Sequence, residues 1–386
     1  MTAANATDDT DDTKERNMTE NNTLQERAVL DALRTVMDPD LNRDIVSLNF
    51  VKDLKIDGGA VSFTIELTTP ACPMKKEMER MAREAVTALS DVKTVEINMT
   101  AAVTRGAVEK EKQAVEGVRN VIAVGSGKGG VGKSTVTVNL AIALAQSGAA
   151  VGILDADIYG PNIPLMMGIT GRPYAIGERI QTLANYGVRL MSMGFLMDDD
   201  DTPVIWRGPM LHSIIQQFIR QVDWGELDYL LIDLPPGTGD VQLSLTQTVP
   251  LTGAVVVSTP QDVALQDARK AIQMFRQVDV TVLGIVENMS YFECPKCGEI
   301  SHVFSHGGGA KTAERYDVPF LGDVPLTIAL REGGDAGKPV VAMTPEAPAA
   351  EAFRQIAAQA AARVSIVNAA KRNLPIIQLN TDTIIQ

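Results

Sequence analysis

The chain has 386 residues, 45% of them hydrophobic, which is enough for two domains with separate cores. The formal net charge of -13 argues against nucleic acid as a partner, because phosphate backbones are bound mainly by clustered Lys and Arg. Three cysteines, an odd number in a long chain, exclude a disulfide framework and predict a reducing compartment, the cytoplasm. No stretch reaches the roughly 20 apolar residues of a spanning helix, so we expect no membrane insertion.

The first part of the chain predicts a small domain behind a disordered leader. Residues 1–22 are polar and acidic, which is typical of disorder. Residues 23–100 predict an α+β domain in the order α-β-β-α-β, in which a capping box at Thr23 starts the first helix and Pro39 ends it. A hairpin joined at "DGG", a helix over 72–89 and a strand over 92–99 follow. The charged, Ala-rich residues 101–117 are the expected linker.

The second part, residues 118–365, alternates short apolar strands with helical stretches such as residues 133–146 and 264–276. This alternation predicts an α/β fold with a mostly parallel sheet covered by helices on both faces. Ligands are then expected beyond the carboxyl ends of the strands. An Ala-rich segment, residues 345–364, predicts a terminal packing helix, and residues 366–386 are the expected C-terminal tail.

A phosphate-binding loop is predicted by "GKGGVGKS", which matches G-x-x-x-x-G-K-[ST] between a strand and a helix. Its glycines let backbone N–H groups turn toward phosphate oxygens, and the helix N-terminus adds partial positive charge. Lys133 is expected to reach the β and γ phosphates of ATP, and Ser134 to ligate Mg²⁺. The expected nucleotide-binding residues of the loop are Gly127, Lys128, Gly129, Gly130, Val131, Gly132, Lys133, Ser134 and Thr135.

Lys128 is an additional lysine inside this loop. Its side chain cannot easily fold back onto phosphates that its own backbone amides surround, so one interpretation directs it to a neighbouring subunit. The other interpretation is a solvated loop lysine. Spacing alone leaves both open.

Three aspartates follow strands near this loop. Asp233 in "LLIDLPPGTGD" is expected to hold the Mg²⁺ shell. Asp155 and Asp157 in "GILDADIYGPN" are expected to divide two tasks, the orientation of the metal or lysine and contact with the attacking water. Strand-end aspartates can also merely cap a helix. No cis arginine finger is readable, so we expect slow hydrolysis.

These motifs, together with "WRGPM" at residues 206–210 and "CPKCG" at residues 294–298, resemble the Mrp/ApbC family of iron-sulfur cluster carrier ATPases. That family is related to MinD, ParA and the nitrogenase iron protein, and the resemblance covers roughly residues 115–365. It implies that Lys128 contacts nucleotide phosphate across a dimer interface and that Asp157 positions the attacking water. It also suggests Asn288 as an adenine contact.

The N-terminal domain, with "TTPACPM", resembles the small domain of iron-sulfur assembly factors. Cys72 matches the cysteine of that segment. It is either a cluster or partner contact or an inert packed residue.

Cys294 and Cys297 provide two thiolates on one turn, and two alone do not close a metal site. A 4Fe-4S cluster takes four cysteines, which an isologous homodimer supplies as two pairs on its twofold axis. His302 and His306 offer an alternative, because C-x2-C-x4-H-x3-H can close a tetrahedral zinc site within one chain. The family usually has small residues near His306, in a segment that ends in glycines like "HGGG" here. Unmetallated thiols or a disulfide form a third option.

The sequence therefore predicts an ATP-hydrolysing carrier that assembles a labile 4Fe-4S cluster between two subunits and transfers it to apoproteins, with scaffold proteins as further partners. The alternatives are a MinD- or ParA-like organiser of membrane or DNA cargo, a zinc-binding P-loop ATPase and an electron carrier. The C-terminal residues 367–386 contain only Lys371 and Arg372 as basic residues, which gives the organiser little support.

Overall fold

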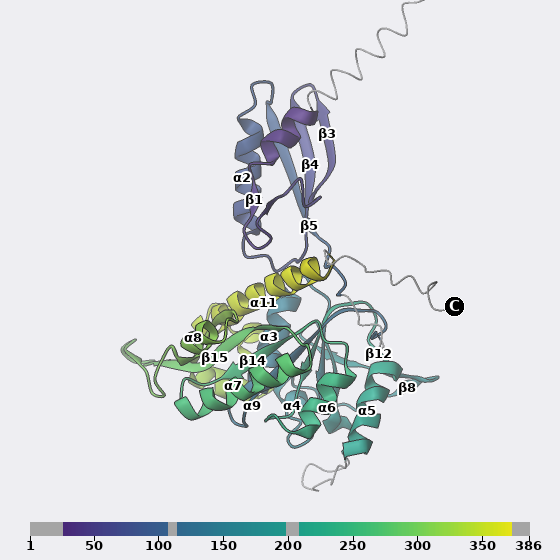
Figure 1. Cartoon of the computed structure of the whole chain (residues 1–386), viewed down its shortest axis with the longest axis vertical. Coiled ribbons are helices and arrows are strands. Elements are labelled where there is room, and N and C mark those ends of the chain that lie inside the picture. Colours follow the sequence, from purple (N-terminus) through teal and green to yellow (C-terminus); the bar gives the residue numbers. More distant parts are fainter. Residues whose placement is uncertain (1–25, 107–113, 198–207, 373–386) are drawn as a thin grey trace, which may run out of the picture. The chain divides into compact units, whose positions relative to one another are not determined.

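The computed structural model describes residues 26–106, 114–197 and 208–372 (Figure 1). The chain divides between Ala102 and Val103 into two compact units. The predicted leader, the capping box at Thr23, Trp206 and residues 373–386 lie outside the described residues.

The first unit contains the predicted α-β-β-α-β elements in order, with two short strands, β1 and β2, added between the first helix and the hairpin. After a helix over residues 26–33, strands β3 and β4 form an antiparallel hairpin through Gly58 and Gly59, both with positive φ, and β5 adds to β4 in parallel. Its other elements are β1 (Met37–Asp38), β2 (Arg43–Asp44), β3 (Val51–Asp57), β4 (Ala60–Leu67), α2 (Lys75–Thr87) and β5 (Thr94–Ala101).

The first helix ends at Leu33, which is earlier than the end predicted at Pro39. Residues 37 and 38 form β1 instead and pair with β2. A residue before proline is disfavoured in the helical region, and the Asp38 carboxylate accepts hydrogen bonds from the backbone N–H groups of Asp40 and Leu41. The turn that follows Asp38 is therefore held by that side chain rather than by a longer helix.

The second unit is built on one nine-stranded sheet. Its inner strands are parallel, in the order β11-β7-β13-β6-β14-β15-β17, and antiparallel strands β10 and β16 pair with β11 and β15. This confirms the predicted, mostly parallel sheet. The strands are β6 (Val118–Ser126), β7 (Val151–Asp155), β10 (Leu183–Asn185), β11 (Val188–Ser192), β13 (Leu227–Asp233), β14 (Gly253–Ser258), β15 (Val282–Glu293), β16 (Ile300–Ser301) and β17 (Phe320–Leu326).

Helices pack on this sheet as two groups. Helices α3, α10 and α11 contact one another, and α5 contacts α6 while α7 contacts α8. Right-handed crossovers place the two groups on opposite faces. The helices are α3 (Lys133–Gln146), α4 (Ile163–Met166), α5 (Gly208–Gln221), α6 (Asp240–Thr248), α7 (Asp262–Gln277), α8 (Gly308–Arg315), α9 (Ile328–Asp335), α10 (Val340–Met343) and α11 (Pro348–Arg372).

Helix α11 continues past the end predicted for it at residue 364. Val367 and Asn368 are buried, and the Asn368 side-chain amide donates to Thr104 O at 3.0 Å and to Asn120 Oδ1 at 2.9 Å. The first residues assigned to the tail therefore belong to the helix, because a polar contact far away in the sequence holds them there.

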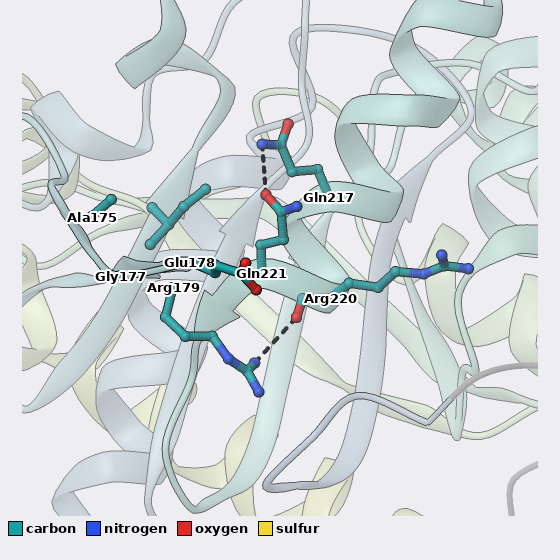
Figure 2. Close-up of a pocket in the computed structure, with 8 residues that line it drawn as sticks. Ala175, Gly177, Glu178, Arg179, Gln217, Arg220 and Gln221 are labelled. Carbon is teal, nitrogen blue, oxygen red and sulfur yellow. Dashed lines mark hydrogen bonds between the residues drawn. The ribbon is translucent and has the colours of Figure 1, made fainter.

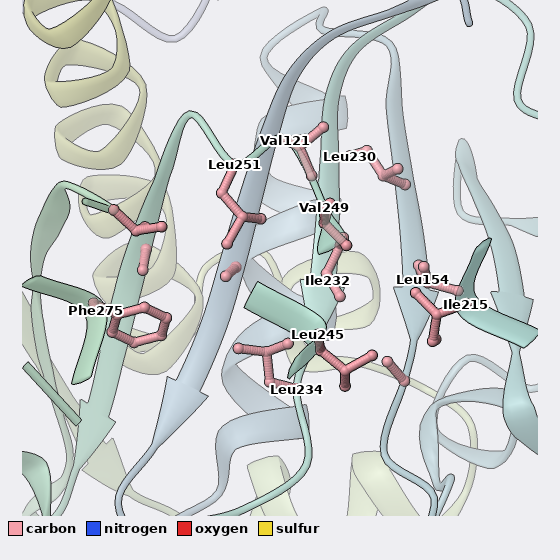
Figure 3. Close-up of a cluster of buried hydrophobic side chains, with 14 of the residues drawn as sticks. Val121, Leu154, Ile215, Leu230, Ile232, Leu234, Leu245, Val249, Leu251 and Phe275 are labelled. Atoms are coloured by element: carbon pink, nitrogen blue, oxygen red, sulfur yellow. The ribbon is translucent and has the colours of Figure 1, made fainter. Parts of the chain in front are cut away.

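One hydrophobic core of this unit lies between the sheet and the helices α5, α6 and α7 (Figure 3). Leu230 and Ile232 of β13 lie in the same cluster as Leu245 of α6 and Phe275 of α7, and all four are at most 2% exposed. Burial on both faces explains why these strands are continuous apolar runs. The rigid sheet in turn holds the loops at its carboxyl edge.

Candidate functional site

The phosphate-binding loop connects the end of β6 to the start of α3 at Lys133. Gly130 and Gly132 have φ of 80° and 79°, a conformation that side chains disfavour. A Cβ on Gly127 would overlap the backbone of Asp267 in α7. Gly130 and Gly132 thus allow the positive φ of the loop, whereas Gly127 allows its close approach to α7. Thr135 lies half-buried in the first turn of α3.

Lys133 is buried at the centre of the site. Its Nζ lies 2.7 Å from Asp233 Oδ2 and 3.4 Å from Asp157 Oδ2. Burial lowers the pKa of Lys133, but the carboxylates of Asp233 and Asp157 outweigh it and raise the pKa above its ordinary value. The lysine therefore stays charged in a dry site.

Asp233 ends β13 and binds three side chains of α3. Besides Lys133, its Oδ2 accepts from Ser134 Oγ at 2.6 Å and its Oδ1 accepts from Thr137 Oγ1 at 2.7 Å. The prediction did not include Thr137. Its position four residues after Lys133, on the same helical face, was the available signal.

Asp155 is fully buried at the end of β7. Its oxygens accept from Ser192 Oγ at 2.8 Å and from the backbone N–H groups of Asp157 and Ile163 at 3.2 and 3.4 Å. Burial, and then the Asp233 carboxylate, raise the pKa of Asp155 to about 8. Asp155 therefore holds the loop that carries Asp157, and the prediction missed its partner Ser192.

Asp157 follows two residues later and is 8% exposed. Its Oδ1 accepts from the Tyr159 N–H at 3.2 Å, while Oδ2 faces Lys133. Burial raises the pKa of Asp157, and Lys133 opposes that shift. The structure thus brings Asp157, Asp233 and Lys133 together, as expected from their positions after parallel strands.

Lys128 is part of the phosphate-binding loop, and Asn288 of β15 contacts the backbone of that loop. Ser126 Oγ donates to the Lys128 carbonyl at 2.9 Å, and the Lys128 side chain is half-buried. The Asn288 amide donates to Val131 O at 2.9 Å, so Asn288 supports the loop directly. Its Oδ1 is buried and has no hydrogen-bond partner among the described residues.

Cys294 and Cys297 lie on a tight turn between β15 and β16. Gly298 N donates to Cys294 O at 2.8 Å, and Cys294 N donates to Glu299 O at 2.9 Å. Cys297 is exposed and Cys294 is half-buried, and both are free thiols. The pKa of Cys294 is lowered, first by the backbone N–H groups of Lys296 and Cys297 and then by the Cys297 side chain.

The two histidines do not complete a site with these cysteines. The rings of His302 and His306 stack on each other with centroids 4.6 Å apart, and His306 Nδ1 lies 2.8 Å from Ser290 Oγ. Among the described residues, no three His, Cys, Asp or Glu side chains gather as metal ligands. The geometry therefore does not support the predicted alternative of a single-chain zinc site.

Cys72 of the first unit is half-buried against that unit's core. Burial raises the pKa of its thiol, and the nearby Asp38 and Asp40 add to the shift. This environment favours the packed thiol over the reactive thiolate.

A hollow of about 680 Å³ lies away from these residues, against the small sheet of β8 (Ala175–Ile176), β9 (Arg179–Gln181) and β12 (Val222–Asp223). The Arg179 guanidinium donates to the Arg220 carbonyl at 3.1 Å (Figure 2). Arg179 also pairs with Glu116. The phosphate-binding loop does not line this hollow.

Within the described ranges, no helix is both long and apolar enough to cross a membrane.

Comparison with known proteins agrees with both units. The sequence model of the family described as "NUBPL iron-transfer P-loop NTPase" matches residues 117–361, and that described as "Iron-sulfur cluster assembly protein" matches residues 26–98. An "Iron-sulfur cluster carrier protein" of Synechocystis is 53% identical over 88% of this chain and 98% of its own length. The "Iron-sulfur cluster transfer protein NUBPL" of Mus musculus is 53% identical over 66% of this chain and 80% of its own.

A solved structure is also similar. A nucleotide-binding protein from Archaeoglobus fulgidus in complex with ADP is 42% identical, with a TM-score of 0.55, over 62% of this chain and 93% of that one. These matches agree with the buried lysine–aspartate centre next to a glycine loop and with the exposed cysteine turn on the same sheet. The chain therefore belongs to the NUBPL iron-transfer P-loop NTPase family and carries an N-terminal iron-sulfur cluster assembly domain.

Proposed function

We propose that this protein is an ATP-hydrolysing carrier that holds a 4Fe-4S cluster between two copies of the chain and transfers it to apoproteins. The observation that carries the proposal is the presence of two incomplete sites on one sheet. The nucleotide centre at Lys133 has its acidic groups in place, whereas the turn at Cys294 and Cys297 offers only two thiols. The names of the relatives, cluster carrier and cluster transfer proteins, agree with this cargo.

The loop fits ATP and Mg²⁺ by its donors and acceptors. Its glycines leave room for phosphate oxygens at the N-terminus of α3, and Lys133 is charged. Ser134 Oγ would ligate Mg²⁺. Asp233, which accepts a hydrogen bond from Ser134 Oγ, would hold the water shell of the ion. The bound ion supplies charge neutralisation at the phosphates. The unpartnered Asn288 Oδ1 is an acceptor of the kind that an adenine amino group needs.

Hydrolysis in this proposal is an in-line attack by water on the γ phosphorus, which breaks the bond to the bridging oxygen and releases ADP and phosphate. Asp157 orients the water, because its carboxylate lies beside Lys133 and is itself held by the Tyr159 N–H. Lys128 reaches the phosphates of the other copy and makes hydrolysis depend on pairing. Lys133 stabilises the charge that develops on the phosphates.

The cluster is cargo, and the cysteine turn suits its release. A lowered pKa favours the thiolate of Cys294, the form that binds iron, while exposure of Cys297 leaves access for an acceptor protein. Two such turns meeting on a twofold axis supply four thiolates. Subunit rotation linked to ATP would then open or close the cluster site.

The test is anaerobic reconstitution of the full chain with iron and sulfide, followed by metal analysis and sedimentation. We expect about four irons per pair of chains, lost when Cys294 and Cys297 are both changed to Ser. Transfer to an apo-ferredoxin should require the cluster-loaded dimer and respond to ATP. Equal iron binding by the wild type and the double variant, or a strictly monomeric ATP-loaded protein, would refute the proposal.

A further inference from the structure

The segment that carries the two cysteines is closed at its base by one buried side chain. We call residues 288–306 the cysteine arm; it includes the end of β15, the cysteine turn and β16. Within it, Phe292 pairs with Ser301 and Glu293 pairs with Ile300. The arm starts directly after Glu287 and ends directly before Gly307, so both of its ends lie at that glutamate.

The carboxylate of Glu287 is fully buried and binds both ends of the arm. Its Oε1 accepts from Ser290 Oγ at 2.6 Å and from Gly307 N at 3.0 Å, and Oε2 accepts from Gly309 N at 2.5 Å. A Cβ on Gly309 would lie 3.0 Å from the Glu287 Cβ and 3.1 Å from Oε2. Gly309 thus leaves the space that this carboxylate occupies, and the carboxylate also lies at the positive end of α8.

The contact continues from Glu287 to the histidine stack. Ser290 has a single hydroxyl proton and donates it to Glu287, so the short contact between Ser290 Oγ and His306 Nδ1 requires His306 to carry the proton on Nδ1. His306 stacks on His302, which directly follows β16. A chain of contacts therefore runs from Glu287 to the far strand of the arm.

The next residue, Asn288, binds the phosphate loop. Successive side chains of a strand point to opposite faces, and the Asn288 amide donates to Val131 O while a Cβ on Gly132 would overlap that amide. Met289 then has φ of 56°, and the register of β15 with β17 is broken between Asn288 and Phe292. A strained residue at this point is held in place by its surroundings.

We propose that Glu287 is a positioning residue that couples the nucleotide loop to the cysteine arm: it fixes the base of the arm to the strand position next to Asn288. A shift of Val131 and Gly132 when phosphates bind would move Asn288. The hydrogen bonds of Glu287 with Ser290, Gly307 and Gly309, which we call the clamp, would pass that shift to both strands of the arm. The inference rests on the proposed function, since it concerns how ATP acts on the cluster.

The experiment measures the coupling itself in the full chain. Glu287→Gln keeps the shape and one acceptor oxygen but turns an amide NH₂ toward a backbone donor, so the clamp is broken. Ser290→Ala cuts only the path to His306. The matched control is Glu314→Gln, the same change at an exposed position of α8. Each protein is reconstituted, and its ATP affinity is measured with and without cluster, together with the rate of cluster transfer with and without ATP.

Linkage requires that cluster and ATP change each other's affinity by the same factor, typically about fivefold or more. We expect the wild type and Glu314→Gln to show that factor and Glu287→Gln to show a factor near one. Ser290→Ala, which keeps the contacts of Glu287 to Gly307 and Gly309, should show a factor between these two values. Iron content and ATP affinity of the apo form should stay within about threefold of wild type in all variants. A merely structural role would lower iron content or ATP affinity without abolishing the factor.

Wild-type coupling in both clamp variants would overturn the inference. If Glu287→Gln does not fold, Ser290→Ala decides alone, because it leaves the backbone contacts of Glu287 intact. A wild type that binds no cluster, or that shows no response to ATP, would instead refute the proposed function. The two failures are therefore distinguishable.

Discussion

The ammonium nitrogen of Lys133 lies 2.7 Å from Asp233 Oδ2, and both side chains are buried. They come from the start of α3 and the end of β13, 100 residues apart. Asp233 binds Ser134 as well, so one carboxylate holds the two side chains that are expected to meet phosphate and Mg²⁺.

The two loop lysines should differ sharply in their effect on stability. Lys133→Met leaves the Asp233 carboxylate buried without its cation, so we expect the free energy of unfolding of the nucleotide-free protein to fall by about 3 kcal/mol or more. Lys128→Ala, at a half-buried loop position, should change it by less than about 1 kcal/mol. Urea unfolding followed by the fluorescence of the buried Trp224 measures both, and equal losses would contradict the role given to the pair.

Asp155 should make stability depend on pH in a particular direction. Its folded pKa, about 8, is above the ordinary 3.8, so between these values the folded state holds a proton that the unfolded state has lost. Stability from this group is therefore fully present below pH 4 and is lost as pH rises toward 8. Asp155→Asn removes that part of the slope. Unfolding free energies at pH 5, 6, 7 and 8 test this, and parallel profiles for the two proteins would count against it.

Cys294 should react before Cys72. The thiolate is the nucleophile, and backbone N–H groups lower the pKa of Cys294 while burial raises that of Cys72. At pH 7 we expect iodoacetamide to modify Cys294 before Cys72, as measured by peptide mass spectrometry in the metal-free protein. Cys72→Ser should keep the fast phase and Cys294→Ser should lose it. Faster labelling of Cys72 would show that the N-terminal thiol is the activated one.

Two glycines of the loop should tolerate alanine differently. Gly127→Ala places a Cβ against the backbone of Asp267, which cannot move without shifting α7. Gly130→Ala meets no atom within 4 Å, and its cost comes only from the positive φ, about 1 kcal/mol. Thermal unfolding should therefore rank Gly127→Ala as clearly the less stable variant. The reverse order would mean that φ strain outweighs contact at this loop.

The elements that sequence predicts well here are those with a local cause. The bounds of α3 match the predicted helix over residues 133–146, because the glycine loop must end where the helix begins. The parallel strands were readable as continuous apolar runs. Helix ends without a local cause were predicted wrongly. The helix before Pro39 stops at Leu33, and α11 continues to Arg372. In α11 the Asn368 side chain makes hydrogen bonds to residues that lie 248 and 264 positions away in the sequence.

The sequence by itself determined the family, the phosphate loop and the position of each acidic and sulfur-bearing residue, because glycine spacing and strand-end chemistry are local. Only the tertiary structure decided which groups meet. It placed Thr137 on Asp233, turned Asp155 toward the loop backbone, stacked His302 on His306 and closed the cysteine arm on Glu287. Such contacts join residues distant in the chain, and they depend on how strands and helices pack rather than on any pattern along it.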